Sequence, residues 1–275
     1  MPFEGTHPSG NQSRGQALRA QQIQPCQIGG HLGTGNRALI DTDLYLFKAA
    51  AASTFTFKWD DNNRVGMTNI AMAMDKFRAT MDWIEDELPG HAPVLCLGGR
   101  SNFRYGLYPG YKANRREKIK PWGFSELLDW AKDTYLCIQI DNLETDDILG
   151  SSYLEGDVIV SGDKDMKTIP GTHFQGELVF EVSEDQADHN FFMQALHGDA
   201  TDGYPGCPGV GPVMANKLLA GCESNRERWQ VVMTAYRKKG FDEFHAITQA
   251  RMARILRPGE YDHDNEEPKL WIPPL

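Results

Sequence analysis

Tyr135-Leu-Cys-Ile-Gln-Ile140, with Leu143-Glu-Thr-Asp-Asp-Ile148 after it, is an apolar run that leads into an acidic segment. Apolar runs of this length are typical of buried strands, and a helix is expected to begin at the acidic segment. The same arrangement occurs where Ala38-Leu-Ile40 precedes Asp41 and where Val158–Ser161 precedes Asp163. Strands that alternate with helices predict an α/β fold, with a mostly parallel sheet flanked by helices.

The periodicity of the rest divides the chain into three parts. Residues 1–37 are rich in Gly, Gln, Ser and Pro without a sustained period, which predicts a flexible N-terminal extension. Residues 38–185 hold the alternating pattern, and residues 186–275 are predicted to be helical. The expected strands are 38–40, 93–97, 135–140 and 158–161, and the expected helices are 44–52, 67–88, 124–131, 144–154, 186–197, 213–219, 227–238 and 241–256.

Eight carboxylates lie in four clusters, most of them where a strand ends or a helix begins. Ligands bind beyond the carboxyl ends of parallel strands, so we expect these clusters to converge. Converging carboxylates raise one another's pKa values unless a cation lies between them, and oxygen ligands suit Mg²⁺ and Mn²⁺. For any single pair, capping of a helix start is the alternative. The eight carboxylates are Asp41, Glu144, Asp146, Asp147, Asp163, Asp165, Asp199 and Asp202.

The net charge of −10 is unevenly distributed along the chain. The eight clustered carboxylates contribute −8 and the tail at 260–275 contributes −4, so the rest of the chain carries +2. Between Arg100 and Lys120 there are seven basic residues and one acid, Glu117. A basic stretch beside a metal site attracts a polyanion even when the whole protein is negative, so nucleic acid is the expected partner.

Two further motifs favour phosphate binding. Gly206-Cys-Pro-Gly-Val-Gly211, followed by Pro212, predicts a tight turn that leaves backbone amides free for a phosphate at the next helix start. Tyr111-Lys-Ala-Asn-Arg-Arg116 combines cations that neutralise phosphate with a ring that stacks on a base. An ordinary Gly-Pro helix connection and a solvated basic loop are the alternatives.

Together these residues resemble the 5′ nucleases, also called flap endonucleases. The resemblance rests on Asp41, Glu144-Thr-Asp-Asp147, Asp163-Lys-Asp165, Asp199-Ala-Thr-Asp202 and Gly206-x-x-Gly-Val-Gly211. Tyr111-Lys-Ala-Asn-Arg115 and Met252-Ala-Arg-Ile-Leu256 are similar in particular to the 5′→3′ exonucleases of small tailed bacteriophages. The resemblance covers about residues 38–272.

The resemblance implies a PIN-like nuclease domain at 38–185, a helical arch at about 100–125 and a C-terminal helix–three-turn–helix module within 186–275. It implies a metal-dependent 5′→3′ exonuclease or 5′-flap endonuclease that acts at DNA 5′ ends. Removal of RNA primers from RNA–DNA hybrids, phage DNA replication, recombination and degradation of host DNA in the host cytoplasm are the implied roles. Two divalent ions, Mg²⁺ or Mn²⁺, are implied, with K⁺ at the helix–three-turn–helix and a monomeric chain.

The resemblance also implies roles for single residues. The first metal site would be Asp41, Glu144, Asp146 and Asp147, and the second Asp163, Asp165, Asp199 and Asp202. Lys112 and Arg115 would contact the scissile phosphate and, with Asp41 and Asp146, form the catalytic set. The implied DNA-binding residues are Arg104, Tyr111, Lys112, Arg115, Arg116, Gly206, Gly209, Val210, Gly211 and Lys217.

One departure from the family pattern lies at Leu97-Gly-Gly-Arg100, where the family carries an Asp after the second strand. The first metal site is one ligand short, and Asp43 is a candidate replacement. Two other functions stay open. Asp41-Thr-Asp43 resembles the nucleophile loop of haloacid-dehalogenase-type phosphatases, and a protein with an impaired centre would bind DNA 5′ ends without cutting them. No apolar run is long enough for a membrane span.

Overall fold

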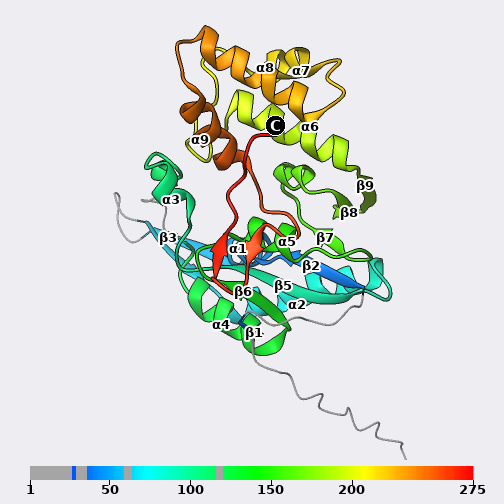
Figure 1. The fold of residues 1–275 in the computed structure, drawn as a ribbon. Coiled ribbons are helices and arrows are strands. Elements are labelled where there is room, and N and C mark those ends of the chain that lie inside the picture. The colour runs from blue at the N-terminus through cyan, green and yellow to red at the C-terminus, as the bar shows by residue number, and fades with distance from the viewer. Residues whose placement is uncertain (1–26, 29–35, 59–63, 116–119, 275) are drawn as a thin grey trace, which may run out of the picture.

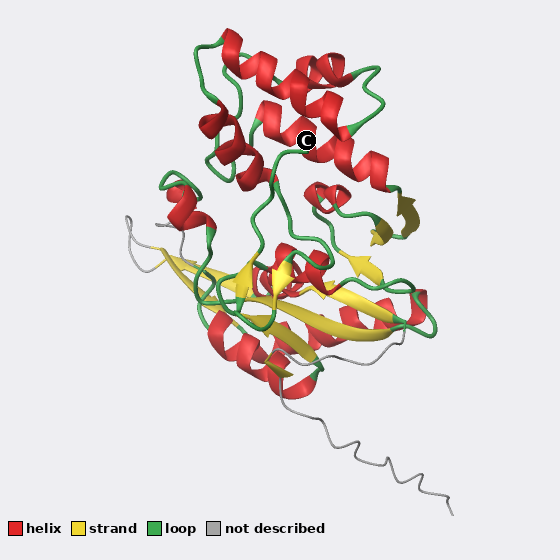
Figure 2. Cartoon of the chain, in the orientation of Figure 1, coloured by secondary structure: helices red, strands yellow, loops and turns green. Residues whose placement is uncertain are grey.

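The computed structural model describes residues 27–28, 36–58, 64–115 and 120–274. A sheet with helices packed on its faces forms one part of the molecule, and a group of helices lies above it (Figure 1). Coloured by secondary structure, the sheet runs through the lower part, with helices on either side of it (Figure 2). None of the helices within the described ranges is both long enough and apolar enough to cross a membrane.

Among the described residues, seven strands form one sheet in the order β1-β6-β5-β2-β7-β8-β9. Neighbouring strands pair in parallel except for β8 and β9, which are antiparallel. The predicted fold class, a mostly parallel sheet flanked by helices, is confirmed. The strands are β1 Gln27–Ile28, β2 Arg37–Asp41, β5 Ala92–Gly98, β6 Cys137–Ile140, β7 Val158–Val160, β8 Gly171–Gln175 and β9 Leu178–Val182.

Helices cover both faces of the sheet because alternate residues of the central strands point to opposite sides. Ala38 and Ile40 pack into one core with α1 (Thr42–Ala51), α2 (Ile70–Glu87) and α4 (Phe124–Thr134). Leu39, between them, packs on the opposite face with α5 (Thr145–Ser152). The strand β2 lies inside the sheet, between β5 and β7, so its last residue, Asp41, lies near the middle of the carboxyl edge.

The helical part consists of α6 (Glu184–His197), α7 (Pro212–Leu219), α8 (Asn225–Lys238) and α9 (Glu243–Ala253), with its own buried apolar core. After α9 the chain returns to the sheet, where Ile255 and Leu256 are buried in the core shared with α5. The short strands β10 (Tyr261–Asp262) and β11 (Glu267–Pro268) follow. Trp271 then packs against Trp229 of α8, so the C-terminal segment joins both parts, which differs from the predicted purely helical 186–275.

Two hairpins are absent from the sequence expectations. β3 (Thr54–Lys58) pairs with β4 (Arg64–Thr68), so the helix expected from residue 67 begins later, at Ile70. Asn69 caps that helix by accepting a hydrogen bond from the Met72 amide (3.0 Å). The second missed hairpin is β8–β9, which ends the sheet in an antiparallel edge.

The two ends of the nuclease part also differ from expectation. The extension predicted for 1–37 ends sooner, because Arg37 opens β2 and forms a buried ion pair with Asp157 (2.5 Å); residues 1–26 and 29–35 lie outside the described ranges. In the arch, defined here as residues 100–125, the described residues before α4 form only the short α3 (Arg104–Leu107) and the 3-10 turn η1 (Ala113–Arg115). A second 3-10 turn, η2, spans Lys164–Thr168.

Candidate metal centre and nucleic-acid interface

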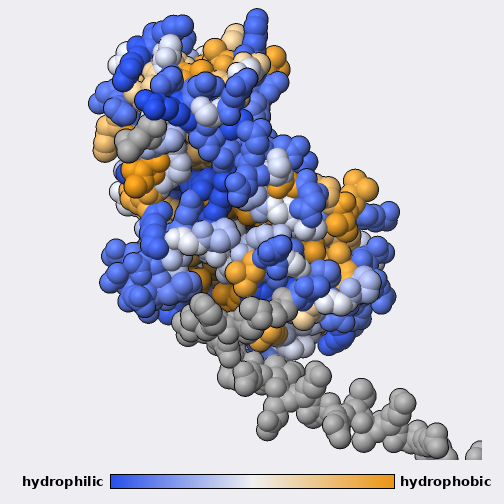
Figure 3. Space-filling model, turned by 45° about the vertical axis from the view of Figure 1, so that its right-hand side comes forward, coloured by the Kyte–Doolittle hydropathy of each residue, from blue (hydrophilic) through white to orange (hydrophobic). Residues whose placement is uncertain are grey.

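A cavity of about 510 Å³ lies at the carboxyl edge of the sheet. It brings together residues from β2, α1, the arch, α5 and the loop after β7. In the space-filling view, hydrophilic residues gather in the hollow between the helical part and the sheet (Figure 3). The convergence expected of parallel strand ends is therefore present. The polar residues of the lining are Asp41, Asp43, Tyr105, Lys112, Arg115, Lys120, Glu144, Thr145, Asp146 and Asp163.

Asp41 is held at the centre of this cavity by its position between β2 and α1. One carboxylate oxygen accepts the Leu44 amide at the start of α1 (3.2 Å), and the other accepts the Ser161 hydroxyl from the loop after β7 (2.6 Å). Burial raises the pKa of Asp41 to about 6, although the two hydrogen bonds oppose the rise. The fold therefore holds the Asp41 carboxylate away from water, where a nearby positive charge would stabilise its ionised form.

Asp146 faces the same region from the first turn of α5. Burial raises its pKa well above the usual range, and the negative charge of Asp41 adds to the rise. Among the described residues, neither Asp41 nor Asp146 forms an ion pair. Two desolvated carboxylates with only oxygen donors fit a hard divalent cation, which supplies the positive charge that their repulsion requires.

Glu144 lies beside them but already has a cationic partner from the arch. The Lys112 ammonium forms an ion pair with Glu144 and lies 3.6 Å from Asp202. Lys112 adopts a left-handed backbone conformation (φ 49°), which is uncommon for a residue with a side chain. Although burial opposes it, the pair with Lys112 helps to lower the pKa of Glu144. Arg115 pairs with Asp202 on the other side (2.7 Å).

Tyr111 does not present its ring to a nucleic acid, contrary to the prediction of base stacking. Its side chain is buried, and its hydroxyl donates to Glu144 (2.6 Å) and lies 3.2 Å from Asp202. The ring packs near Tyr204, which is also buried. Tyr111 thus orients two of the predicted metal ligands, Glu144 and Asp202.

Asp147 is not available to a metal ion, so its assignment to the first site is wrong. It is fully buried, and its two oxygens accept hydrogen bonds from both terminal nitrogens of Arg104 (2.6 and 2.8 Å). The amides of Leu256 (3.2 Å) and Glu144 (3.3 Å) also donate to it, which occupies the carboxylate's capacity to accept. Arg104 is only 2% exposed, so its predicted contact with DNA is wrong for the same reason.

The predicted second site is more open. Asp163 accepts the Asp165 amide (2.9 Å), and Asp199 accepts the amides of Thr201 (2.6 Å) and Asp202 (3.2 Å), so both cap their own turns. Lys164 lies 3.1 Å from Asp165 and 3.8 Å from Asp199. Within the described ranges, no group of three or more His, Cys, Asp or Glu side chains lies close enough to hold one metal ion. The carboxylates approach one another here with a lysine between them.

The glycine turn before α7 divides into a buried and an exposed half. Gly206 is buried, its amide donates to Gln249 (2.9 Å), and a Cβ on it would lie 2.3 Å from the Gly198 nitrogen. Gly206 therefore packs the turn against the helical part, and its predicted contact with DNA is wrong. Gly209, Gly211 and Lys217 are exposed, with Val210 half-buried, and Gly211 begins α7 without a side-chain cap.

Arg116 lies outside the described residues. The sequence reasoning missed the hydroxyl of Ser161, which holds Asp41, and that of Thr145, which donates to Asp43 (2.7 Å). The Ser-Gly-Asp163 and Glu144-Thr145-Asp146 patterns place both hydroxyls next to predicted ligands, and that adjacency is the signal that was available.

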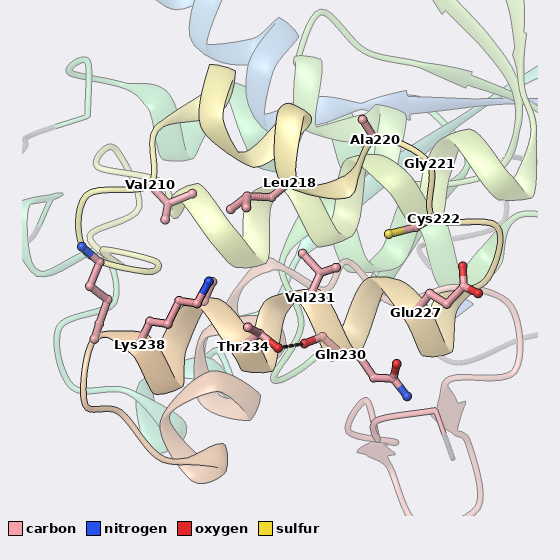
Figure 4. A pocket seen from close by; sticks show the side chains of 12 residues that line it. Val210, Leu218, Ala220, Gly221, Cys222, Glu227, Gln230, Val231, Thr234 and Lys238 are labelled. Atoms are coloured by element: carbon pink, nitrogen blue, oxygen red, sulfur yellow. Dashed lines mark hydrogen bonds between the residues drawn. The ribbon is translucent and has the colours of Figure 1, made fainter.

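A second cavity, of about 540 Å³, lies between α7 and α8 (Figure 4). Val210, Leu218 and Val231 point into it, and Thr234 donates to the Gln230 carbonyl (2.7 Å) along its wall. Its lining holds one carboxylate, Glu227, and is mainly apolar.

Several known proteins are similar to this chain. The exodeoxyribonuclease of Enterobacteria phage T3 is 29% identical, covering 86% of this chain and 92% of the relative. The exonuclease of Escherichia phage T7 is also 29% identical, covering 86% of this chain and 93% of the relative. The solved structure of the T5 D15 protein co-crystallized with metal ions has a TM-score of 0.60 at 16% identity, covering 79% of this chain and 89% of that one, which shows a shared fold. No protein-family profile matches the chain.

Proposed function

Because the chain belongs to the 5′ nuclease family, close to the phage exonucleases, we propose that it is a metal-dependent 5′→3′ exonuclease or 5′-flap endonuclease. It hydrolyses phosphodiester bonds at DNA 5′ ends. The observation that carries the proposal is the cavity at the sheet edge, where Asp41, Glu144 and Asp146 lie opposite Lys112 and Arg115. One cavity therefore holds both the carboxylates that would bind divalent ions and the lysine and arginine that would bind phosphate.

The first metal position is formed by Asp41, Asp146 and Glu144, and the second by Asp163, Asp165, Asp199 and Asp202. Mg²⁺ or Mn²⁺ bound there supplies positive charge that activates water and stabilises the developing charge on the phosphate. Ser161 holds Asp41 in place through its hydroxyl (2.6 Å), and Tyr111 holds Glu144 (2.6 Å). The protein thus orients these two carboxylates with the neutral hydroxyl donors Ser161 and Tyr111.

Lys112 and Arg115 bind the scissile phosphate from the arch. Both now pair with carboxylates of the cavity, Glu144 and Asp202. If Glu144 and Asp202 held divalent ions, Lys112 and Arg115 would be free to bind the phosphate and to stabilise the charge that develops on it. Metal binding and phosphate binding therefore support each other at this edge.

The exposed half of the glycine turn binds the duplex away from the cut. Gly209 and Gly211 lie in the turn that leads into α7, where free backbone amides donate to a phosphate, and Lys217 lies in the last turn of the same helix. A K⁺ ion at this turn, cleavage of RNA in RNA–DNA hybrids and a monomeric state belong to the same proposal. Digestion of primers and of host DNA is the corresponding role in a phage infection.

The test uses the full chain and duplexes labelled at the 5′ end, one blunt and one with a 5′ flap, in Mg²⁺, in Mn²⁺ and in EDTA. We expect cutting with either ion and none in EDTA. Asp165→Asn should slow cutting about 100-fold or more, equivalent to about 2.7 kcal/mol of barrier. The matched control is Asp129→Asn, which removes one exposed carboxylate on α4.

The outcomes separate the possible activities. Release of mononucleotides identifies an exonuclease, and release of the intact flap identifies an endonuclease. Tight binding of 5′ ends without cutting in either ion would replace the proposal with that of a DNA-end-binding protein. Full activity of Asp165→Asn would remove the second metal position.

A further inference from the structure

Asp43 lies in the first turn of α1, two residues after Asp41, and lines the same cavity. Its carboxylate has one cationic neighbour among the described residues, Lys120 at 3.9 Å, and both side chains are largely exposed. Glu144, Asp202 and Asp165, in contrast, have a lysine or arginine within about 3 Å. Asp43 therefore resembles Asp41 and Asp146, which form no ion pair among the described residues, more than it resembles the carboxylates that already have a close cation.

Thr145 fixes the direction of the Asp43 side chain. The Thr145 hydroxyl donates to an oxygen of Asp43 (2.7 Å) and accepts the amide of Gly98 (2.9 Å). Thr145 is 4% exposed and lies between Glu144 and Asp146 at the start of α5. One buried hydroxyl thus joins α1, the end of β5 and the first turn of α5.

The end of β5 leaves room for this arrangement. Gly98 has no side chain, and a Cβ built on it would lie 3.4 Å from the Thr145 hydroxyl oxygen and 3.6 Å from the Asp43 oxygen. A Cβ at residue 98 would therefore touch Thr145 and the Asp43 carboxylate, so a glycine leaves both groups their room. The missing side chain on β5 and the oriented carboxylate on α1 are complementary.

We propose that Asp43, held by Thr145, is a further carboxylate ligand of the metal position formed by Asp41 and Asp146. The inference rests on the proposed function and adds a ligand to its first metal position. Asp43 and Asp41 lie two residues apart at the start of α1, and both line the same cavity as Asp146. A helix-start residue that only favours the α1 dipole would need no hydroxyl to orient it.

The test titrates Mn²⁺ into the full chain without DNA, by calorimetry. Asp43→Asn should weaken binding at one position about tenfold or more, comparable to the loss of a group that supports a metal site. The Mn²⁺ affinity of Thr145→Val should lie between those of wild type and Asp43→Asn. Thr145→Ser keeps the hydroxyl, so it should bind Mn²⁺ as tightly as wild type. Asp129→Asn is the control for loss of one surface charge.

The double variant Asp43→Asn/Thr145→Val should bind Mn²⁺ no more weakly than Asp43→Asn, because Thr145 acts through Asp43. Thermal unfolding of each variant without metal separates folding from binding. Unchanged affinity in Asp43→Asn, together with weakened affinity in Asp146→Asn, would overturn the inference and leave Asp43 as a helix-start residue. Absence of Mn²⁺ binding by the wild type would instead overturn the proposed function.

Discussion

Arg104 and Asp147 form a buried ion pair with two hydrogen bonds, of 2.6 and 2.8 Å, between the base of the arch and α5. Arg104 also donates to the carbonyls of Met252 (3.3 Å) and Arg254 (2.5 Å) at the end of α9. The pair therefore joins three segments that are distant in sequence. It holds the arch next to Glu144, which lies 3.4 Å from the same guanidinium.

Asp147→Asn should destabilise the fold because it leaves the buried Arg104 charge without its partner. The expected loss in the free energy of unfolding is about 3–5 kcal/mol, measured by denaturant titration. The double variant Arg104→Met/Asp147→Leu should recover much of that loss, since it removes both charges. A folded Asp147→Asn protein of wild-type stability and reduced Mn²⁺ affinity would show that Asp147 is a metal ligand after all.

Asp146→Asn should separate activity from stability. It removes a ligand, so cutting should slow about 100-fold or more. It also removes repulsion from Asp41, so the metal-free protein should unfold about 2 °C higher than wild type.

With Mg²⁺ added, wild type should unfold at a higher temperature than Asp146→Asn, because a bound ligand stabilises only the protein that binds it. Differential scanning fluorimetry with Mg²⁺ and with EDTA measures both temperatures. Equal responses of wild type and variant to Mg²⁺ would contradict a metal position at Asp146.

Arg115→Ala should reduce the dependence of DNA binding on salt. Loss of one phosphate contact lowers the slope of log affinity against log salt by about 1. Fluorescence anisotropy with Ca²⁺, a hard cation that takes the same oxygen ligands, measures binding while Asp202 is engaged by the ion and Arg115 is free. Lys76→Ala, an exposed residue on α2, is the control and should leave the slope unchanged. An unaltered slope in Arg115→Ala would place Arg115 away from the bound phosphates.

Gly211→Ala should weaken duplex binding without disturbing the fold. Gly211 has an ordinary backbone conformation (φ −88°), and a Cβ on it would meet no atom within 4 Å. The added methyl would instead stand where a phosphate approaches the α7 amides, so we expect about tenfold weaker binding. Mn²⁺ affinity and thermal stability should match wild type. Unchanged DNA affinity would move the duplex contact elsewhere.

The carboxylates at the strand ends were predictable because each one follows a short apolar run. Asp41 and Asp163 follow such runs, and parallel strands bring their carboxyl ends to one edge. The hairpins β3–β4 and β8–β9 were not predicted, since β3 and β9 are largely exposed. Exposed strand faces, as in β3, carry no burial pattern to detect.

By itself, the sequence determined the α/β class, the positions of the acidic clusters and the glycine turn, because local patterning records these. Only the tertiary structure decided which members of a cluster face the cavity. Asp146 and Asp147 are adjacent in the chain, yet α5 directs one to the cavity and the other to Arg104. Successive helical residues point about 100° apart, so their roles depend on what packs against each face. Thr145 and Asp43, 102 residues apart, became partners for the same reason.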